Sequence, residues 1–375
     1  MIITIHRGTH QIGGCITELT TDTTKILIDF GEELMPQTPI DEGEILRGCD
    51  AVFITHYHSD HVGLHTHIPP HIPIYLGKVA KQILVELTAR TNKENLYKVE
   101  RFRTYTPMQS IKVGDIEVRP LLVDHSAFDA YMFLIKAEGK TLLHTGDFRG
   151  HGFRGKGLMP TLQKYVGKVD ALIIEGTTLY RDGGEAKTER ALQLQAATLM
   201  KEKKYVFVLC SSTNIDRIAS LYHANPFGRY FLCDAYQKAV LKIVRENVGP
   251  RSSLYDLQKI VTYGPNIEDR FFERGFCMLV RNRDDHRRII DKYPEDERLI
   301  LYSIWKGYVE GKHKSERMIR FLDGLHYTYL HTSGHADAET ICEVVSAVSP
   351  DVIYPIHTEN AAWFKGRFGR VEVKT

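Results

Sequence analysis

Residues 51–62 read Ala-Val-Phe-Ile-Thr-His-Tyr-His-Ser-Asp-His-Val, an apolar run followed at once by His56, His58, Asp60 and His61. A strand places alternate side chains on one face, so His56 and His58 are predicted to reach one metal ion. The turn that follows can direct Asp60 and His61 at a second ion nearby. We therefore expect a two-metal centre, an arrangement typical of hydrolases.

A structural explanation of these histidines must be weighed first. The chain contains 18 histidines, and a single histidine on a strand usually belongs to the surface or to a satisfied core. Three imidazoles and a carboxylate side by side serve no packing purpose without a cation. The cluster therefore favours a metal site, although each residue alone would not.

Composition indicates an ordinary globular chain. Its 375 residues are 43% hydrophobic and 26% charged, which excludes disordered and collagen-like classes and allows two domains with their own cores. The six cysteines form no Cys-x-x-Cys pair, which favours reduced thiols over disulfides or a zinc ribbon. Neither a signal peptide nor a membrane-spanning apolar run is evident, so we expect a cytoplasmic protein without a membrane partner.

The order of expected elements predicts two kinds of domain. Short strand-like runs dominate the first third, and the runs 131–136 and 141–144 indicate a hairpin. From Lys187 onward, helices and strands alternate as in a parallel sheet. We expect an α/β protein divided into 1–185 (first part of a core domain), 186–326 (an inserted domain) and 327–375 (the rest of the core).

Three further candidate ligands follow apolar strands far apart in the chain: His125, Asp147 and His357. Loops at strand ends can carry such residues into one cleft, although polar residues at strand ends are common. Asp147 is favoured because Gly146 allows close approach of the backbone, and a carboxylate can bridge two cations.

These residues together resemble the metallo-β-lactamase superfamily, whose members hold two metals at the edge of an αββα sandwich. The order of motifs is similar to the β-CASP branch, the nucleic-acid-processing nucleases, with an inserted α/β domain. Glu175 matches motif A, His335 motif B and His357 motif C. The spacings of 22 residues from His125 to Asp147 and from His335 to His357 also resemble ribonuclease J.

The resemblance implies a ligand set. One zinc ion would be bound by His56, His58 and His125, the other by Asp60, His61 and His357, with Asp147 bridging. Imidazoles and carboxylates suit Zn²⁺, though Mn²⁺ is an alternative, and two such ions generate hydroxide from water near neutral pH. That hydroxide would attack phosphorus in line.

Roles for residues outside this ligand set follow from the same resemblance. Asp60, His335 and Glu175 are the expected catalytic residues, with His335 as the proton donor to the leaving oxygen and Glu175 holding its tautomer. Asp29 would orient a metal-binding histidine. The alternative for His335 is a capping or core histidine, and for Glu175 a charge at a helix N-terminus.

Substrate contacts are expected from residues that can bind phosphate at a helix start or ahead of motif B. They are Ser211, Ser212, Asn214, His331 and Ser333. Ser212 and Thr213 can equally be helix caps. The arginines at 281, 283, 287 and 288 alternate with acidic residues, so a solvated charged face competes with an RNA path.

We therefore expect a cytoplasmic RNA-processing hydrolase, a zinc-dependent ribonuclease acting as an exonuclease, an endonuclease or both. The histidine at motif C resembles members that act on RNA rather than DNA. Alternatives are a DNA nuclease, a small-molecule metallohydrolase of esters, thioesters or lactams, and a non-catalytic RNA-binding subunit. Ribonuclease J has a further C-terminal domain associated with assembly, for which this chain, ending at Thr375, leaves no room, so the oligomeric state stays open.

Overall fold

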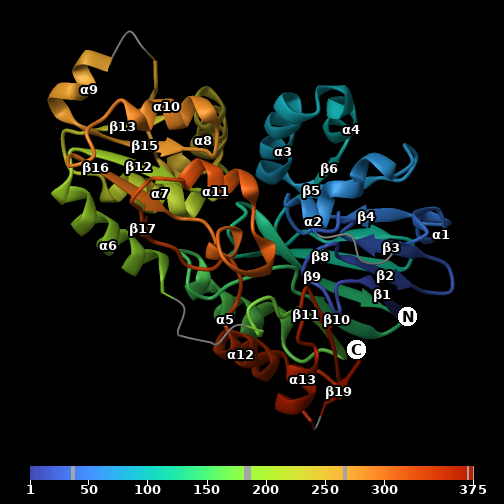
Figure 1. The fold of residues 1–375 in the computed structure, drawn as a ribbon. Helices are drawn as coiled ribbons and strands as arrows, with labels where there is room; N and C mark the ends of the chain where they lie inside the picture. Colours follow the sequence, from blue (N-terminus) through green and yellow to red (C-terminus); the bar gives the residue numbers. More distant parts are fainter. Residues whose placement is uncertain (35–38, 181–186, 265–267, 370, 375) are drawn as a thin grey trace. The chain divides into compact units, whose positions relative to one another are not determined.

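A computed structural model describes residues 1–34, 39–180, 187–264, 268–369 and 371–374. Contacts between residues divide the chain into two units. Unit 1 comprises Met1–Glu185 and Gly334–Thr375, and unit 2 comprises Ala186–Ser333. In Figure 1, unit 1 runs from blue to green and returns in red, and unit 2 runs from yellow-green to orange.

Two sheets form the centre of unit 1. The first has the order β1-β2-β3-β4-β5-β6 and the second β19-β18-β11-β10-β9-β8-β7. The first contains β1 (Ile2–Arg7), β2 (Ile16–Thr20), β3 (Lys25–Ile28), β4 (Ala51–Phe53), β5 (Ile74–Gly77) and β6 (Arg103–Tyr105). The second contains β7 (Ile111–Val113), β8 (Ile116–Val123), β9 (Ala130–Ala137), β10 (Lys140–His144), β11 (Ala171–Glu175), β18 (Val352–Ile356) and β19 (Glu372–Val373).

Strand β9 shows how the layers of unit 1 pack. Its side chains alternate between two cores, as the two-residue period of a strand requires. Phe133 and Ile135 face a core shared with Phe53 of the first sheet, whereas Met132 and Leu134 face a core shared with the helices. A strand buried on both faces is apolar throughout, which explains the run Tyr-Met-Phe-Leu-Ile.

Helices cover the outer faces of both sheets and complete an αββα sandwich. Apolar residues of α12 (Ala338–Val348) and α13 (Ala362–Arg367) join the core beneath the second sheet. On the first sheet's side lie α1 (Glu42–Leu46), α3 (Lys78–Thr91) and α4 (Leu96–Glu100). The short helices α2 (Ser59–Val62) and α5 (Leu158–Thr161) complete the unit. The fold class expected from the sequence is confirmed.

The expected hairpin is also present. Strands β9 and β10 pair antiparallel, with Ala137 opposite Lys140. The two residues between them, Glu138 and Gly139, have φ of 51° and 72°. Two consecutive positive φ angles belong to the tight turn whose twist matches that of paired strands.

Unit 2 is built on one parallel sheet with the order β14-β13-β15-β12-β16-β17. Its strands are β12 (Tyr205–Leu209), β13 (Tyr230–Cys233), β14 (Ile260–Thr262), β15 (Phe276–Val280), β16 (Arg298–Tyr302) and β17 (Thr328–Tyr329). Its helices are α6 (Glu189–Glu202), α7 (Ile215–Ala224), α8 (Ala235–Val248), α9 (Glu268–Arg274), α10 (Asp284–Asp291) and α11 (Glu316–Leu322). The expected alternation of helix and parallel strand is confirmed.

The second boundary between the units falls at 333/334, later than the 326/327 expected from the sequence. The reason is β17, which pairs with β16 and so ties residues beyond 326 to the sheet of unit 2. A two-residue strand carries too little periodic signal to be recognised in a sequence. Within the described residues, no helix is long and apolar enough to cross a membrane.

Candidate metal centre

The candidate ligands of unit 1 lie just beyond the ends of its strands. His125 follows β8, Asp147 follows β10 and His357 follows β18. Strand β4 ends at Phe53, so His56 and His58 lie on the loop after it. The alternation of a strand, which the sequence predicts for these two residues, therefore does not extend to them. Asp60 and His61 lie on α2, which begins at Ser59.

Three ring nitrogens converge in a first group. His56 Nε2 lies 3.1 Å from His58 Nδ1, and His125 Nε2 lies 3.3 Å from the same atom. Ligands of one tetrahedral zinc ion at its usual bond lengths lie about 3.3 Å apart. The three histidines therefore have the spacing that a shared ion requires.

A second group combines two carboxylates with two histidines. His357 Nε2 lies 3.0 Å from Asp60 Oδ2, and His61 Nε2 lies 3.2 Å from Asp147 Oδ2. The same Asp147 oxygen lies 3.7 Å from His357 Nε2 and 3.9 Å from His56 Nε2. Asp147 thus stands between the two groups, where a carboxylate can contact two cations.

The backbone around Asp147 and His357 has unusual conformations. Gly146 has φ of 53°, and a Cβ there would lie 2.9 Å from the side chain of Thr55 and 3.0 Å from the carbonyl oxygen of Tyr131. His357 itself has φ of 49°. Such conformations cost free energy in residues other than glycine and persist where the surroundings impose them, often at functional sites.

Hydrogen bonds at Nδ1 fix the orientation of the rings. His125 Nδ1 donates to the carbonyl oxygen of Gly334 (2.7 Å), and His61 Nδ1 donates to Asp29 Oδ2 (2.7 Å). Thr55 Oγ1 lies 3.0 Å from His56 Nδ1 and 2.9 Å from Asp29 Oδ2. Because that hydroxyl donates to the carboxylate, it accepts from the ring. In each case Nδ1 takes the hydrogen bond, so Nε2 is the atom that the ring presents to a metal.

Two buried atoms aimed into the centre support its fit to a cation. Asp147 Oδ1 and His61 Nε2 make no hydrogen bond, although Nε2 is close to Asp147 Oδ2. A buried polar atom without a hydrogen bond is costly unless another partner, such as an ion, satisfies it. The donor set of nitrogens and carboxylate oxygens suits Zn²⁺ and also Mn²⁺.

Protonation states in unit 1 also favour cation binding. Burial lowers the pKa of His56 and His125 far below the usual value and that of His58 to about 4, so these rings are neutral at pH 7. Burial alone would raise the pKa of Asp147, but His357 and His61 hold it low. Burial alone would lower the pKa of His61, but Asp147 and Asp29 raise it. In the absence of a cation, the protonated ring of His61 carries the positive charge that these carboxylates require. A bound cation would supply that charge instead.

Glu175 and His335 form a pair beside the centre. His335 Nδ1 lies 3.0 Å from Glu175 Oε2 and 3.6 Å from Asp147 Oδ2. Glu175 is the last residue of β11 and is fully buried, and it also accepts from the backbone N–H of Phe148 (2.7 Å). The side chain of His335 is 21% exposed, so a substrate can reach the ring.

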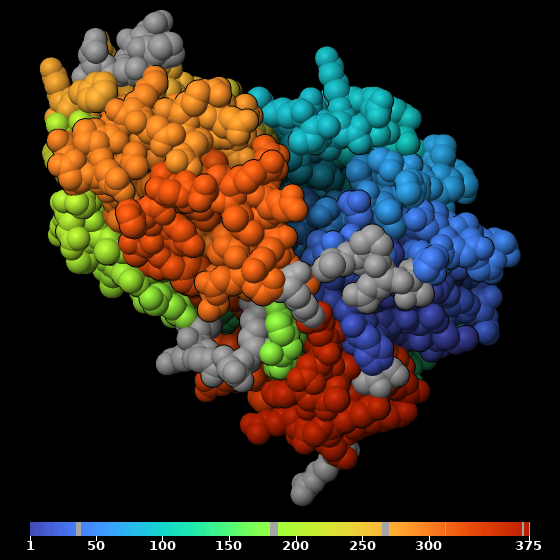
Figure 2. All heavy atoms as spheres, viewed as in Figure 1, coloured from blue at the N-terminus to red at the C-terminus, as the bar shows by residue number. Residues whose placement is uncertain are grey.

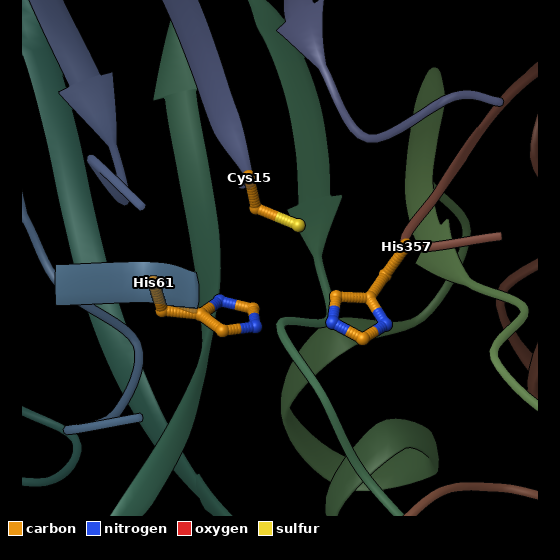
Figure 3. A group of neighbouring side chains, drawn as sticks. All are labelled: Cys15, His61 and His357. Carbon is orange, nitrogen blue, oxygen red and sulfur yellow. The ribbon is translucent and has the colours of Figure 1, made fainter. Parts of the chain in front are cut away.

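Cys15 and Thr177 border the centre but were missed in the sequence. The Sγ of Cys15 and a ring nitrogen each of His61 and His357 lie within 4.8 Å of one another, and the sulfur points between the rings (Figure 3). Thr177 Oγ1 contacts both Glu175 and His357. An isolated cysteine or threonine has no spacing pattern to reveal it. All six cysteines are free, as expected.

The expected substrate contacts all lie in unit 2. Arg217, which is fully buried, lies 3.4 Å from His331 Nδ1 and donates to the carbonyl oxygen of Thr332. It thereby brings the 330–333 segment close to the loop that precedes α7. The N-cap of α7 is Asn214, whose side chain accepts from the N–H of Arg217, so the cap is neither Ser212 nor Thr213. Ser211 Oγ contacts Thr213, and Ser212 Oγ is buried without a hydrogen bond.

Comparisons with known proteins show what the chain resembles. Residues 24–208 match the model of the beta-lactamase superfamily domain. Ribonuclease J of Sinorhizobium meliloti is 23% identical over 84% of this chain and 58% of its own length; that of Helicobacter pylori (strain ATCC 700392 / 26695) is 22% identical over 94% and 55%. The chain thus spans little more than half of these relatives. The DNA cross-link repair protein SNM1 of Arabidopsis thaliana is 35% identical, over 28% of this chain and 20% of its own.

A solved structure has the same fold over its whole length. A protein of unknown function from Enterococcus faecalis V583 superposes with a TM-score of 0.78 at 22% identity, covering 100% of this chain and 97% of that one. Residues 24–208 thus resemble the beta-lactamase superfamily domain, and the chain as a whole shares the fold of that solved structure. Over most of its length the chain also resembles ribonuclease J.

Proposed function

We propose that this protein is a metal-dependent ribonuclease that hydrolyses RNA phosphodiester bonds. The observation that carries the proposal is the convergence of seven side chains, from 56 to 357 in the sequence, on one centre beside the pair Glu175–His335. The proposed ligands are His56, His58, Asp60, His61, His125, Asp147 and His357. Two zinc ions are the proposed cofactors, and manganese is the alternative.

Bound divalent ions would supply an activated water near neutral pH and would neutralise charge on the phosphate. The residues of the chain prepare the site for them. Three neutral imidazoles form the first position, and Asp60, His61 and His357 form the second. Asp29 and Thr55 hold the rings of His61 and His56 so that their lone pairs face the centre. Precise orientation of this kind strengthens metal binding and activity.

His335 is the proposed proton donor to the leaving oxygen. Glu175 accepts from its Nδ1, which fixes the tautomer, so proton transfer to a substrate would take place at Nε2. Because Glu175 is itself held by the N–H of Phe148, its position is fixed independently of His335. His335 is therefore expected to affect turnover more than metal binding.

RNA is the proposed substrate because the relatives that match most of the chain are named ribonuclease J, and because motif C holds His357. A DNA nuclease is the second candidate. It is favoured by the higher identity to the DNA cross-link repair protein, although that match covers a much smaller part of the chain. Phosphate contacts are proposed for Ser211, Ser212, Asn214, His331 and Ser333, with Arg217 holding the 330–333 segment that carries the last two.

A cleavage assay tests the proposal. The purified protein is loaded with zinc or manganese and incubated with end-labelled RNA, single-stranded DNA and a chromogenic lactam. The double variant Asp60→Ala, His61→Ala is the inactive control, and His67→Ala, on an exposed histidine, is the matched control. RNA cleavage that is lost only in the double variant supports the proposal. Preferential cleavage of DNA or lactam, or equal cleavage by the double variant, contradicts it.

A further inference from the structure

An aromatic cluster lies at the β17 edge of the unit 2 sheet. We name it the tyrosine platform, and it consists of Tyr302, Trp305, Tyr308, Tyr327 and Tyr329. The rings of Tyr327 and Tyr329 lie 5.6 and 6.0 Å from the ring of Tyr302, and Trp305 lies 5.6 Å from Tyr308. Tyr308, Tyr327 and Tyr329 are 41%, 41% and 42% exposed, so their rings are anchored but remain accessible.

The local structure explains why these rings gather. Tyr327 and Tyr329 are two residues apart, so they project from the same side of an extended chain. Tyr329 pairs in register with Tyr302 of β16, which is buried. The hydroxyl of Tyr302 donates to the carbonyl oxygen of Trp305 (2.9 Å) and ties the next turn to the strand. In the space-filling view the orange residues, which belong to the later part of unit 2, form one continuous surface (Figure 2).

The platform continues toward the proposed phosphate contacts. The ring of Tyr329 lies 6.0 Å from that of His331, and both residues precede Ser333. Residues 302–331 contain five Lys or Arg against three Asp or Glu, a net charge of +2 that equals the net charge of the entire chain. Proteins bind single-stranded nucleic acids by combining a positively charged groove with aromatic rings on which bases stack, and this segment of the sequence supplies the rings and a net positive charge.

We infer that the tyrosine platform binds unpaired nucleobases of a single-stranded nucleic acid by stacking, with the backbone phosphates next to His331. This inference rests on the proposed function and specifies how its substrate is held. Every base has a π-face, so such a platform accepts many sequences but excludes a paired duplex, whose bases are already stacked. The platform would thus select single strands without reading their sequence.

The chain offers a reporter inside the platform. It has two tryptophans, and Trp363→Phe leaves Trp305 as the only one. Short oligo-uridine and oligo-adenosine RNAs, the corresponding DNAs and an RNA hairpin are titrated while the fluorescence of Trp305 is recorded. The background carries Asp60→Ala and His61→Ala, so that no strand is cleaved. Single strands are expected to quench Trp305, and the paired stem is expected to bind more weakly.

Substitutions distinguish stacking from other contacts. Tyr327→Ala together with Tyr329→Ala is expected to weaken binding of single strands at least about fivefold, since each stacked base contributes appreciably to affinity. The Tyr→Phe pair keeps the rings and is expected to bind like the parent. Tyr97→Ala removes an exposed tyrosine of unit 1 and is the matched control. An RNA backbone without bases is expected to bind all variants equally.

Several results would overturn the platform. Base stacking would be contradicted if the alanine pair bound single strands as tightly as the parent, or if the phenylalanine pair lost as much affinity as the alanine pair. It would also be contradicted if light scattering showed that the alanine pair differs from the parent in oligomeric state. Failure of the proposed function is distinguishable. The protein with its native metal ligands could cleave no RNA and still bind single strands with an affinity that the alanine pair lowers. In that case the platform is supported and the ribonuclease proposal is contradicted. If no single strand binds to the protein, the platform is contradicted as well.

Discussion

Thr177 Oγ1 lies 2.7 Å from Nδ1 of His357, although 180 residues separate the two in the chain. The pairing of β11 with β18, in which Glu175 is opposite Ile356, brings them together. The hydroxyl also lies 2.6 Å from Glu175 Oε2 and has a single proton, which it donates to that carboxylate. It therefore accepts from His357, whose Nε2 lone pair is left for a metal. Glu175 thus supports both His335 and His357.

Thr177→Val is expected to weaken metal binding about 10- to 100-fold, because the ring of His357 loses the partner that fixes its tautomer. Thr177→Ser keeps the hydroxyl and is expected to remain within a few-fold of the parent. Competition with a fluorescent chelator measures both affinities. Equal affinity of the valine and serine variants would show that the hydroxyl does not orient His357.

Metal removal is expected to lower the stability of unit 1. An ion that binds only the folded state stabilises it by about 2.7 kcal/mol at a hundredfold excess over its Kd. Thermal unfolding after dialysis against a chelator, with and without added Zn²⁺, measures the difference. The variant Asp60→Ala, His61→Ala is expected to lose the response and His67→Ala to keep it. A response that persists in the double variant would place the stabilising ion elsewhere.

Much of the fold could be predicted because its signals are local. The His56 to His61 spacing, the apolar run of β9 and the alternation that begins at α6 each occupy a short window of sequence. The hairpin after β9 followed from its turn residues. By contrast, the end of β4 at Phe53 and the short strand β17 depend on pairing with distant partners, which a single sequence does not display.

The candidate metal ligands could be predicted from the sequence, but the residues that orient them could not. Histidines and carboxylates are recognisable as ligand types, and the resemblance to a family assigned distant ones. Thr177 and Thr55 act through one hydroxyl each, and threonine is too common for its type to indicate such a role. Arg217 was hidden because its partners, Glu189 and Thr332, lie 28 and 115 residues away.

Cys15→Ser is expected to lower the affinity for Cd²⁺ more than that for Mn²⁺. Sulfur is a soft donor, and the thiol lies between two rings that present harder nitrogen donors. Burial raises the pKa of Cys15, so the thiol is protonated until a soft cation displaces the proton. Competition titrations with both metals measure the change. Cys49→Ser, another buried cysteine of unit 1, is the control, and an equal loss for both metals would exclude a role for sulfur.

Arg217→Leu is expected to destabilise unit 2 by about 3–5 kcal/mol. In the parent protein, Arg217 Nη2 lies 2.9 Å from Glu189 Oε1. The substitution leaves this buried carboxylate without its charged partner. Asp285→Ala breaks the exposed pair with Arg283 and is expected to cost at most about 1 kcal/mol. Urea unfolding followed by circular dichroism measures both. Similar small losses in the two variants would mean that water reaches Glu189.

Acid is expected to destabilise unit 2 through His286. Burial lowers the pKa of this ring below its usual 6.5, and its Nδ1 accepts a 2.7 Å hydrogen bond from the N–H of Arg281. Asp285 and Asp234 oppose the shift, and Arg281 and Arg283 add to it.

Because the unfolded chain binds the proton more readily, the contribution of His286 is intact above about pH 6.5 and is lost as the pH falls toward the lower folded pKa. His286→Asn keeps an acceptor for Arg281 but cannot titrate in this range. Urea midpoints at pH 7 and pH 5 are therefore expected to fall further for the parent than for the variant. If both fall equally, the acid sensitivity of unit 2 lies in other groups, and His286 is accommodated in its charged form.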